Sequence, residues 1–328
     1  MFKVLSIVPK SRIERFGVEI PEGIEIKFLE PPYTDEELIE AAKDVDCIFD
    51  TSVDPISRKV IESLPNLKLI QTEGVGFNQV DIEAATEHGV IVCNNKNVNA
   101  FPVAEQTVGM IIALLRRFNY ADKQIKAGKF VEVQNEYRTK GYKELSSRHV
   151  GIVGFGAIGR ELARLLKPFG CRISYYDVIR PSKEVEEELG VSYLDYDEIC
   201  KQCNIISYHV PVLPNTINMA NMEAFKKMQK DTIIINMARG EIVNQEDLAA
   251  ALEKGIIAGA GLDTLCPEPP GEDHVLLKLS EEASNRIMLT PHIGGTNDEA
   301  FERMHRWAYE NMLAVANGKE PKNIVNPK

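Results

Sequence analysis

The sequence predicts an α/β fold of two domains, each built on a parallel β-sheet. Short apolar runs alternate with amphipathic stretches in both halves of the chain, which is the pattern of a parallel sheet covered by helices on both faces. A length of 328 residues is more than one ordinary core accommodates. A glycine-rich turn from Gly154 to Gly159 also separates one apolar run from the helix that follows it, as in nucleotide-binding sheets.

The first hundred residues predict one of the two sheets. Strands are expected at 4–8, 47–49, 67–70 and 90–93, and helices at 35–42, 58–63 and 80–87. Several of these helices follow an acidic or hydroxyl residue that can cap the first turn. A longer helix is expected at 99–118, because Val103, Thr107 and Ile111 share one apolar stripe.

The region from His149 onward predicts the second sheet. Its strands are expected at 150–153, 172–176, 205–208, 232–236, 257–262 and 287–289. Six parallel strands with helices between them match a Rossmann sheet that binds a dinucleotide. The tail at 298–316 predicts a final helix, with Pro321 marking its end.

The composition excludes several classes of partner. Lys and Arg number 38 against 49 Asp and Glu, so the net charge of −11 argues against nucleic acid and anionic membranes. The longest apolar helical run, 108–115, is far too short to cross a bilayer. The six cysteines predict reduced thiols, and the Cys200–Cys203 pair offers too few ligands for a metal site. Because the N-terminus opens a strand instead of a signal peptide, we expect a cytoplasmic protein.

The glycine turn predicts the cofactor. Gly154 allows the tight turn, Gly156 lets the backbone approach a pyrophosphate, and Gly159 lets the helix pack on the strand. The N-terminus of that helix offers N–H donors and a partial positive charge to phosphate. Asp177 ends the next strand, where a carboxylate accepts the ribose hydroxyls and repels a 2′-phosphate, which favours NAD. Arg180 weighs slightly toward NADP, and a glycine turn without any ligand is the structural alternative.

Polar residues that follow three successive strands predict the reaction. Arg239 follows the strand at 232–236, Glu268 lies in the loop after 257–262, and His292 follows 287–289. Ligands of open α/β sheets bind beyond the carboxyl ends of the strands, so the three side chains are expected at one edge. A guanidinium binds a carboxylate through two hydrogen bonds, and an imidazole beside a carboxylate suits general acid/base chemistry. The alternatives are an arginine paired with a structural acid and a structural histidine.

The motifs "VGIVGFGAIGRELA", "NMARGEIVNQEDLAAAL", "GLDTLCPEPP" and "LTPHIGG" stand in this order along the chain. In these motifs the chain resembles the D-isomer-specific 2-hydroxyacid dehydrogenases, the family of glyoxylate and hydroxypyruvate reductases, D-lactate dehydrogenases and phosphoglycerate dehydrogenases. The resemblance implies that Arg239 orients the substrate carboxylate, Glu268 supports the histidine, and His292 transfers the proton. It also implies that the backbone amides of Val75 and Gly76, in "TEGVGFNQVD", bind the same carboxylate.

The resemblance further implies the domain arrangement and the residues that contact NAD. A substrate-binding domain is expected at 1–98 and 292–328, with the NAD-binding domain inserted at 99–291. A homodimer built around the cofactor domains and the helix at 99–118 is expected as well. The positions that match cofactor contacts are Gly154, Gly156, Ala157, Ile158, Gly159, Asp177, His209, Val210, Thr216, Met237, Ala238 and Asp263.

The chain is therefore expected to be an NAD-dependent oxidoreductase that interconverts a 2-oxo acid and its (R)-2-hydroxy acid. The resemblance places the loop 51–57 over the distal end of the substrate, where phosphoglycerate dehydrogenases carry arginines. This loop has no basic residue before Arg58 and contains Asp54, so a non-phosphorylated substrate such as glyoxylate or hydroxypyruvate is predicted.

Three alternatives stay open. The first is a phosphoglycerate dehydrogenase without a regulatory domain, if another segment supplies the cations. The second is a formate dehydrogenase, which by the resemblance would need a glutamine where Glu268 stands. The third is an NADH-sensing protein without enzymatic activity, because such relatives keep the same three residues. Cys266 introduces a thiol near the expected site, two residues before Glu268, and its role is left open.

Overall fold

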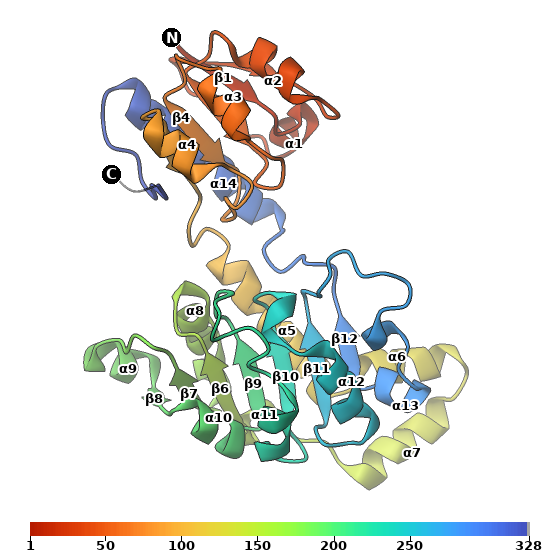
Figure 1. The fold of residues 1–328 in the computed structure, drawn as a ribbon. Helices are drawn as coiled ribbons and strands as arrows, with labels where there is room; N and C mark the ends of the chain where they lie inside the picture. The colour runs from red at the N-terminus through yellow and green to blue at the C-terminus, as the bar shows by residue number, and fades with distance from the viewer. Residues whose placement is uncertain (327–328) are drawn as a thin grey trace. The chain divides into compact units, whose positions relative to one another are not determined.

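The computed structural model describes residues 1–326, which divide into two compact units (Figure 1). The first unit contains Met1–Asn99 and the segment from Thr296 onward, and the second is Ala100–Gly295, inserted into the chain of the first. The second unit thus ends at Gly295 and includes His292, whereas the sequence analysis placed the domain boundary before His292. The reason is that the amides of Ile293 and Gly294 are hydrogen-bonded to Asp263 in the second unit.

The first unit has a five-stranded parallel sheet in the order β2-β1-β3-β4-β5. The strands are β1 (Phe2–Ser6), β2 (Ile24–Phe28), β3 (Cys47–Asp50), β4 (Leu69–Thr72) and β5 (Ile91–Cys93). The sequence analysis missed β2, in which charged Glu25 and Lys27 alternate with apolar residues because the strand lies at the edge of the sheet.

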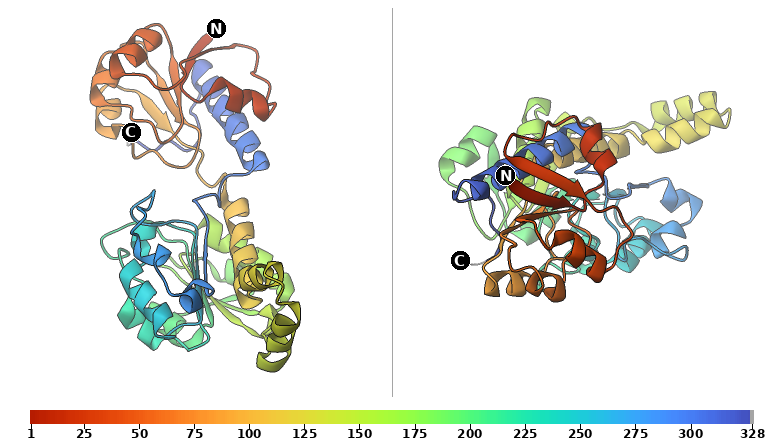
Figure 2. Two further views of the ribbon diagram at one scale, coloured as in Figure 1. Left: turned by 90° about the vertical axis from the view of Figure 1, so that its right-hand side faces the viewer. Right: turned by 90° about the horizontal axis from the view of Figure 1, so that it is seen from above.

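Helices cover both faces of this sheet. They are α1 (Lys10–Arg15), α2 (Asp35–Ala42), α3 (Arg58–Glu62), α4 (Ile82–Glu87) and α14 (Asp298–Ala316). Helices α2, α3 and α4 pack on one face, whereas Ile13 of α1 and Tyr309 of α14 belong to the cluster on the other face, as the left view of Figure 2 shows for α14. The final helix has the predicted bounds and ends before Gly318, whose φ of +66° terminates it.

The second unit has a seven-stranded parallel sheet in the order β12-β11-β10-β9-β6-β7-β8. The strands are β6 (His149–Val153), β7 (Arg172–Tyr176), β8 (Val191–Tyr193), β9 (Ile205–Tyr208), β10 (Ile233–Asn236), β11 (Gly259–Leu262) and β12 (Ile287–Leu289). Six strands were predicted, and β8 is the one missed, because an edge strand of three residues carries almost no periodic signal. The α/β class with two Rossmann or flavodoxin-like domains is confirmed.

The helices of the second unit are α5 (Ala100–Leu115), α6 (Phe118–Lys126), α7 (Phe130–Lys140), α8 (Ala157–Leu166), α9 (Lys183–Leu189), α10 (Tyr196–Gln202), α11 (Met222–Lys227), α12 (Gln245–Glu253) and α13 (Glu281–Ser284). The helix predicted at 99–118 is too long, because Arg117 adopts a left-handed conformation (φ +49°) and a new helix, α6, begins at Phe118. No helix within residues 1–326 is both long and apolar enough to span a membrane.

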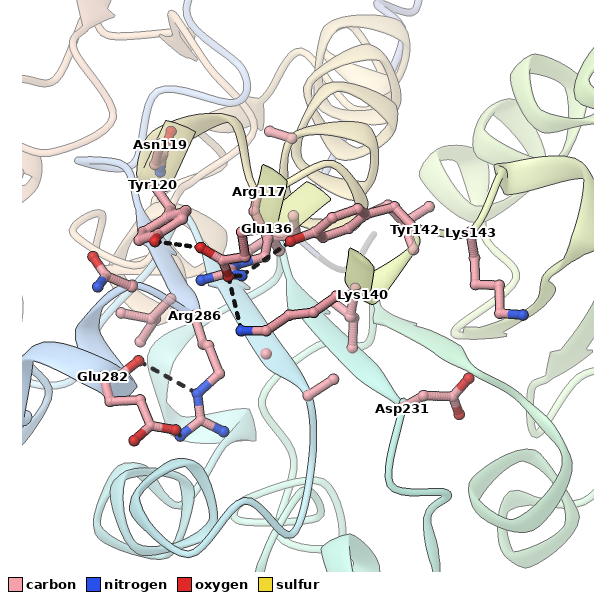
Figure 3. A pocket seen from close by; sticks show the side chains of 18 of the residues that line it. Arg117, Asn119, Tyr120, Glu136, Lys140, Tyr142, Lys143, Asp231, Glu282 and Arg286 are labelled. Carbon is pink, nitrogen blue, oxygen red and sulfur yellow. Dashed lines mark hydrogen bonds and ion pairs between the residues drawn. The ribbon is translucent and has the colours of Figure 1, made fainter. Parts of the chain in front are cut away.

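A cavity of about 880 Å³ lies in the second unit at the amino ends of β10, β11 and β12 (Figure 3). Its wall contains an ionic cluster in which Glu136 accepts hydrogen bonds from Arg117 (2.9 Å), Tyr120 (2.6 Å) and Lys140 (2.9 Å). These bonds, the Tyr120 bond first, lower the pKa of Glu136 to about 2. Because ligands of open sheets bind at the carboxyl ends of the strands, this cavity lies at the opposite edge from the expected site.

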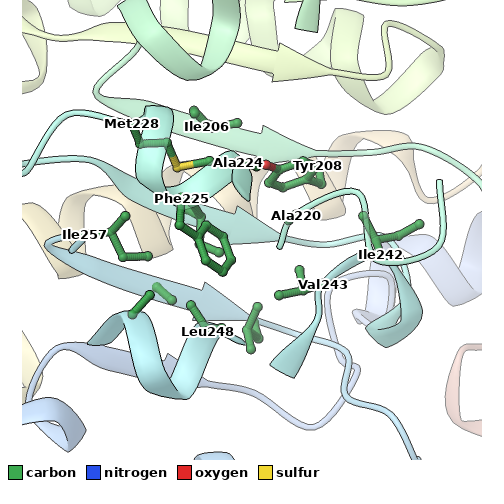
Figure 4. Packing of buried hydrophobic residues seen from close by; sticks show 14 of the residues in the cluster. Ile206, Tyr208, Ala220, Ala224, Phe225, Met228, Ile242, Val243, Leu248 and Ile257 are labelled. Atoms are coloured by element: carbon green, nitrogen blue, oxygen red, sulfur yellow. The ribbon is translucent and has the colours of Figure 1, made fainter. Parts of the chain in front are cut away.

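The core of the second unit makes the sheet a rigid support for the strand ends. On one face Phe225, Tyr208 and Leu248 pack between α11, α12 and the strands, all with 0% exposure (Figure 4). On the other face α5 and α8 pack together through residues such as Met110 and Leu162. Side chains at the ends of β9, β10 and β11 are therefore carried by closely packed elements, which favours precise positioning.

Phe225→Ala tests this core. Removing a fully buried phenyl ring should lower the free energy of unfolding by about 3–5 kcal/mol, because a cavity is left behind. Phe169→Ala is the matched control, since Phe169 is 41% exposed, and it should change stability by less than about 1 kcal/mol. Urea titrations followed by circular dichroism measure both. Equal effects of the two substitutions would contradict the packing described.

Candidate functional site

The carboxyl ends of three neighbouring strands carry the predicted reactive residues. Strands β10, β11 and β12 are adjacent and in register, with Asn236, Leu262 and Leu289 aligned across them. The chain continues from these ends to Arg239, Glu268 and His292. The structure therefore brings three segments that are far apart in sequence to one edge of the sheet.

Glu268 and His292 form a hydrogen-bonded pair. The Glu268 Oε1 atom lies 2.7 Å from His292 Nδ1, and both side chains are 41% exposed. A carboxylate at Nδ1 holds the proton on that nitrogen and leaves Nε2 to face a reacting group. The His292 Nε2 atom has no hydrogen-bonding partner within residues 1–326, so it is free to exchange a proton with a ligand.

Asp263 holds the loop that carries His292. This carboxylate is only 3% exposed and accepts hydrogen bonds from the amides of Ile293 (3.0 Å) and Gly294 (2.8 Å). It also accepts from Gln106 Nε2 of α5 (2.9 Å) and from the Thr290 hydroxyl. The amide of His292 donates to the Asp263 carbonyl oxygen (2.7 Å), which keeps His292 in a left-handed conformation (φ +54°).

Two of these residues were missed or described differently in the sequence analysis. Gln106 was not named in the sequence analysis. The only signal in the sequence is that Gln106 is a polar residue within the apolar helix α5. Asp263 was expected near the nicotinamide. That place stays a prediction, and the structure adds that the side-chain oxygens of Asp263 accept hydrogen bonds from the protein, so Asp263 also positions the His292 loop.

Arg239 is an exposed cation without an acidic partner. Its Nη1 donates to the neighbouring Ala238 carbonyl (2.8 Å), and no carboxylate within residues 1–326 lies within ion-pair distance. The alternative of a structural ion pair is therefore not what the structure shows. The turn is held against the loop that leads to Glu268, because a Cβ atom on Gly240 would lie 2.2 Å from the Leu265 carbonyl.

The glycine turn has the shape that a dinucleotide requires. Gly154 has a φ of +96°, and a Cβ atom there would lie 2.6 Å from the His209 carbonyl oxygen. A Cβ atom on Gly159 would lie 2.2 Å from the Gly154 oxygen, so this glycine permits the helix to pack closely. Gly156, by contrast, faces open space, and α8 begins directly after it at Ala157 and Ile158. A pyrophosphate can thus approach the backbone and the helix N-terminus.

Asp177 lies beside this turn at the end of β7. Its carboxylate accepts hydrogen bonds from the amides of Phe155 (2.6 Å) and Ile179 (2.9 Å). Arg180, which weighed toward NADP in the sequence, is bonded to both oxygens of Glu186 (2.7 and 3.0 Å). The residues present therefore fit NAD, with a carboxylate at the ribose position and with Arg180 already bonded to Glu186.

The other residues expected at the cofactor lie around the same edge. His209, Val210 and Thr216 follow β9, and β9 and β6 form the topological switch point at which such sheets bind ligands. Burial lowers the pKa of His209, whose Nε2 pairs with Ser207 (2.8 Å), so the ring is neutral near pH 7. Thr216 ties its loop together by donating to the Pro211 carbonyl (2.6 Å). Met237 and Ala238 follow β10 and are buried.

The loop at Val75 and Gly76 belongs to the first unit and follows β4. The Gly74 amide donates to the Ser52 hydroxyl (2.8 Å), and Asn94 donates to the Val75 carbonyl (2.7 Å). The amides of Val75 and Gly76 donate to no acceptor within residues 1–326. Two consecutive free amides at the end of a strand suit an anionic ligand.

The cysteines and potential metal ligands form no metal site in the part of the chain that the structure describes, residues 1–326. The six cysteines are free thiols, of which Cys266 is exposed, and burial raises the pKa values of Cys200 and Cys203. Within residues 1–326 no group of three or more His, Cys, Asp or Glu side chains is arranged to hold a metal ion.

Comparisons with known proteins agree on one family. Residues 108–294 match the family model described as "D-isomer specific 2-hydroxyacid dehydrogenase, NAD binding domain". The chain is 38% identical over 296 residues to a glyoxylate reductase from Thermofilum pendens, covering 90% of this chain and 85% of the relative. It is 37% identical over 294 residues to a D-3-phosphoglycerate dehydrogenase from Methanocaldococcus jannaschii, covering 89% of this chain and 54% of that protein. The crystal structure of a D-lactate dehydrogenase with NAD+ from Lactobacillus jensenii matches with a TM-score of 0.85 at 27% identity, covering 99% of this chain and all of that one.

Asp177→Ala tests the assignment of the ribose acid. Removing the carboxylate should reduce the preference for NADH over NADPH by about tenfold or more, because repulsion of a 2′-phosphate is lost. Dissociation constants from nucleotide fluorescence titrations measure the ratio. Asp197→Ala, which removes an exposed carboxylate paired with Lys227, is the control and should leave the ratio unchanged. A wild-type protein that prefers NADPH would contradict the assignment.

Proposed function

Because this chain belongs to the family of D-isomer-specific 2-hydroxyacid dehydrogenases, which are NAD-dependent oxidoreductases, we propose that it reduces a small, non-phosphorylated 2-oxo acid to the (R)-2-hydroxy acid and catalyses the reverse reaction. One observation carries the proposal. The Glu268–His292 pair and the acid-free Arg239 follow adjacent strands at one sheet edge.

NAD, when bound, supplies or accepts the hydride. The turn at Gly154, Gly156 and Gly159 and the start of α8 would hold its pyrophosphate, and Asp177 its ribose. His292 Nε2 donates a proton to the oxygen on C2 of the substrate during reduction and takes it back during oxidation. Glu268 stabilises the positive charge that His292 carries in its protonated state.

Arg239 binds the substrate carboxylate through its planar guanidinium and polarises the neighbouring carbonyl. The absence of an acidic partner supports this role, because an arginine already paired with a carboxylate would have to exchange it. We further infer that the amides of Val75 and Gly76 bind the same carboxylate. Their lack of acceptors within residues 1–326 supports this inference.

The side chain of the substrate is proposed to carry no phosphate. The loop 51–57 contains no basic residue, and Asp54 lies within it. Arg58, the next cation along the chain, is already paired with Glu87 (2.6 Å) and lies near Asp81 and Glu83 as well. The similarity to glyoxylate reductases fits this proposal, whereas the similarity to a phosphoglycerate dehydrogenase keeps that activity as the second candidate.

His292→Asn tests the proposed reaction. With NADH and glyoxylate or hydroxypyruvate as substrate, kcat should fall by roughly 10²–10⁴, because the proton donor is lost. The dissociation constant of NADH should stay nearly the same. His88→Asn, at an exposed position of the first unit, is the control and should retain full activity. Near-normal turnover of the His292 variant would remove this residue from the mechanism, and a wild-type protein that reduces no 2-oxo acid would refute the function.

A homodimer is also proposed, formed through α5, α6 and α7. These helices leave large apolar side chains exposed, namely Phe101 (45%), Phe118 (51%), Phe130 (55%) and Val131 (62%). Exposed apolar groups clustered on a few elements commonly mark an interface between proteins. A second copy of this chain is the partner that the family resemblance implies.

Light scattering tests the dimer. The wild-type protein should have about twice the mass of one chain, 36.7 kDa, and Phe130→Glu should shift the mass toward a single chain because a charge would be buried in the interface. Phe169→Glu, at an exposed position outside these helices, should leave the mass unchanged. A monomeric wild-type protein would contradict the proposal.

A further inference from the structure

Asp50 is a buried carboxyl group without a partner. It is the last residue of β3 in the first unit and has 0% exposure. Within residues 1–326 neither of its side-chain oxygens forms a hydrogen bond of normal geometry, although the backbone amides of Ser52 and Thr51 lie near enough to act on the carboxyl. Buried polar groups in folded proteins are nearly always satisfied, so an unpaired buried carboxyl calls for an explanation.

The position of Asp50 is where such a sheet binds ligands. In the order β2-β1-β3-β4-β5 the switch point lies between β1 and β3, because the chain leaves these strands toward opposite faces of the sheet. Asp50 stands at the carboxyl end of β3, at this point. Its side chain is therefore at the edge that open α/β sheets use for ligands, on a fully buried strand that fixes its direction.

The free amides of Val75 and Gly76 lie at the same edge of the same unit. Asp50 is aligned with Thr72 of β4, and its carbonyl oxygen accepts from the Glu73 amide (2.7 Å). Two residues further on, the Ser52 hydroxyl accepts from the Gly74 amide, and the Ser52 carbonyl oxygen is 3.6 Å from where a Cβ atom on Gly76 would lie. A substrate whose carboxylate reaches the amides is therefore held close to Asp50.

The charged groups around Asp50 cannot neutralise it. Glu73, which directly follows β4, pairs with Arg12 (2.7 Å) and with the buried His305 of α14 (2.9 Å), so these two groups are already engaged. Asp54 on the following loop is a second acid, and the Tyr33 hydroxyl is buried without a partner. Burial raises the pKa of Asp50 to about 7, and Asp54 and Glu73 add to the rise, while the amides of Ser52 and Thr51 act in the opposite direction.

We infer that Asp50 is a specificity-determining residue, which accepts a hydrogen bond from a hydroxyl group on the side chain of the 2-oxo acid. The inference rests on the proposed function and names the substrate class, a 3-hydroxy-2-oxo acid such as hydroxypyruvate. An apolar side chain would leave the buried carboxyl unpaired, and a phosphate would place two anions together. Sites built to bind a hydroxyl group reject analogues that lack it far more strongly than apolar pockets reject a missing methylene group.

The test compares kcat/KM with NADH for hydroxypyruvate and for 2-oxobutanoate, in which a methyl group replaces the hydroxyl. The wild-type protein should favour hydroxypyruvate by about 10²-fold or more. Asp50→Leu should bring the ratio close to one, and Asp50→Asn, which keeps an acceptor oxygen, should give an intermediate ratio. Asp44→Asn is the control, because that exposed carboxylate of the same unit is paired with Lys27 and lies outside the loop 51–57, and it should leave the ratio unchanged.

The pH dependence of the ratio is a second measurement. Reduction of either substrate requires a proton from His292. The pH dependence caused by His292 is therefore the same for both values of kcat/KM and cancels in their ratio. Because the carboxylate form of Asp50 predominates only above a pKa of about 7, the preference for hydroxypyruvate should increase between pH 6 and pH 8 in the wild-type protein and stay constant in Asp50→Leu. A ratio that rises equally in both proteins would overturn the inference.

The outcomes separate this inference from the proposed function. A protein that reduces 2-oxo acids but has the same ratio in the wild type and in both Asp50 variants refutes only the role of Asp50. A protein that reduces none of them refutes the proposed function. In that case the role of Asp50 is tested by binding. The measurement is the increase in Tm of the protein when hydroxypyruvate or 2-oxobutanoate is added in the presence of NAD+. Equal increases with hydroxypyruvate and 2-oxobutanoate overturn it, and a larger increase with hydroxypyruvate that Asp50→Leu abolishes supports it.

Discussion

The buried carboxylate of Asp263 is the interaction on which the reactive edge of the second unit depends. A charge with 3% exposure is tolerated only when donors surround it, and here they come from Gln106 on α5, from Thr290 after β12, and from the loop amides of Ile293 and Gly294. The hydrogen bonds to Asp263 therefore connect helix α5, the ends of strands β11 and β12, and the loop that carries His292. The direction of the His292 ring toward Glu268 follows from the same bonds.

Among the buried acids of residues 1–326, Asp263 and Glu73 are hydrogen-bonded to distant parts of the chain, whereas Asp50 is not. Asp263 in the second unit and Glu73 in the first are both satisfied by side chains or amides from distant segments. Asp50 is equally buried, but within residues 1–326 its side chain forms no hydrogen bond of normal geometry, although Asp50 stands beside the satisfied Glu73. Since the fold supplies partners for its other buried acids, the difference is the physical basis for assigning Asp50 to a ligand.

The arginines show the same division. Arg58, Arg117 and Arg180 are each paired with a carboxylate, which is expected in a chain with a net charge of −11. Arg239 follows a fully buried strand and yet has no acid within reach in residues 1–326. An acidic protein can bind an anionic substrate only through such local positive groups, here a free guanidinium, helix N-termini and unbonded backbone amides.

The sequence by itself determined the two parallel sheets, the glycine turn with Asp177, and the strand ends that carry Arg239, Glu268 and His292. These features depend on the periodicity and spacing of residues within a few tens of positions. Such local patterns can be recognised in a single sequence. Only the tertiary structure decided that β2 and β8 are edge strands, that Arg180 is bonded to Glu186, that Gln106 reaches Asp263 across 157 positions, and that Asp50 is left without a partner. The reason is physical: whether a polar side chain is satisfied depends on which distant groups the fold brings within about 3 Å of it, and no local pattern records that distance.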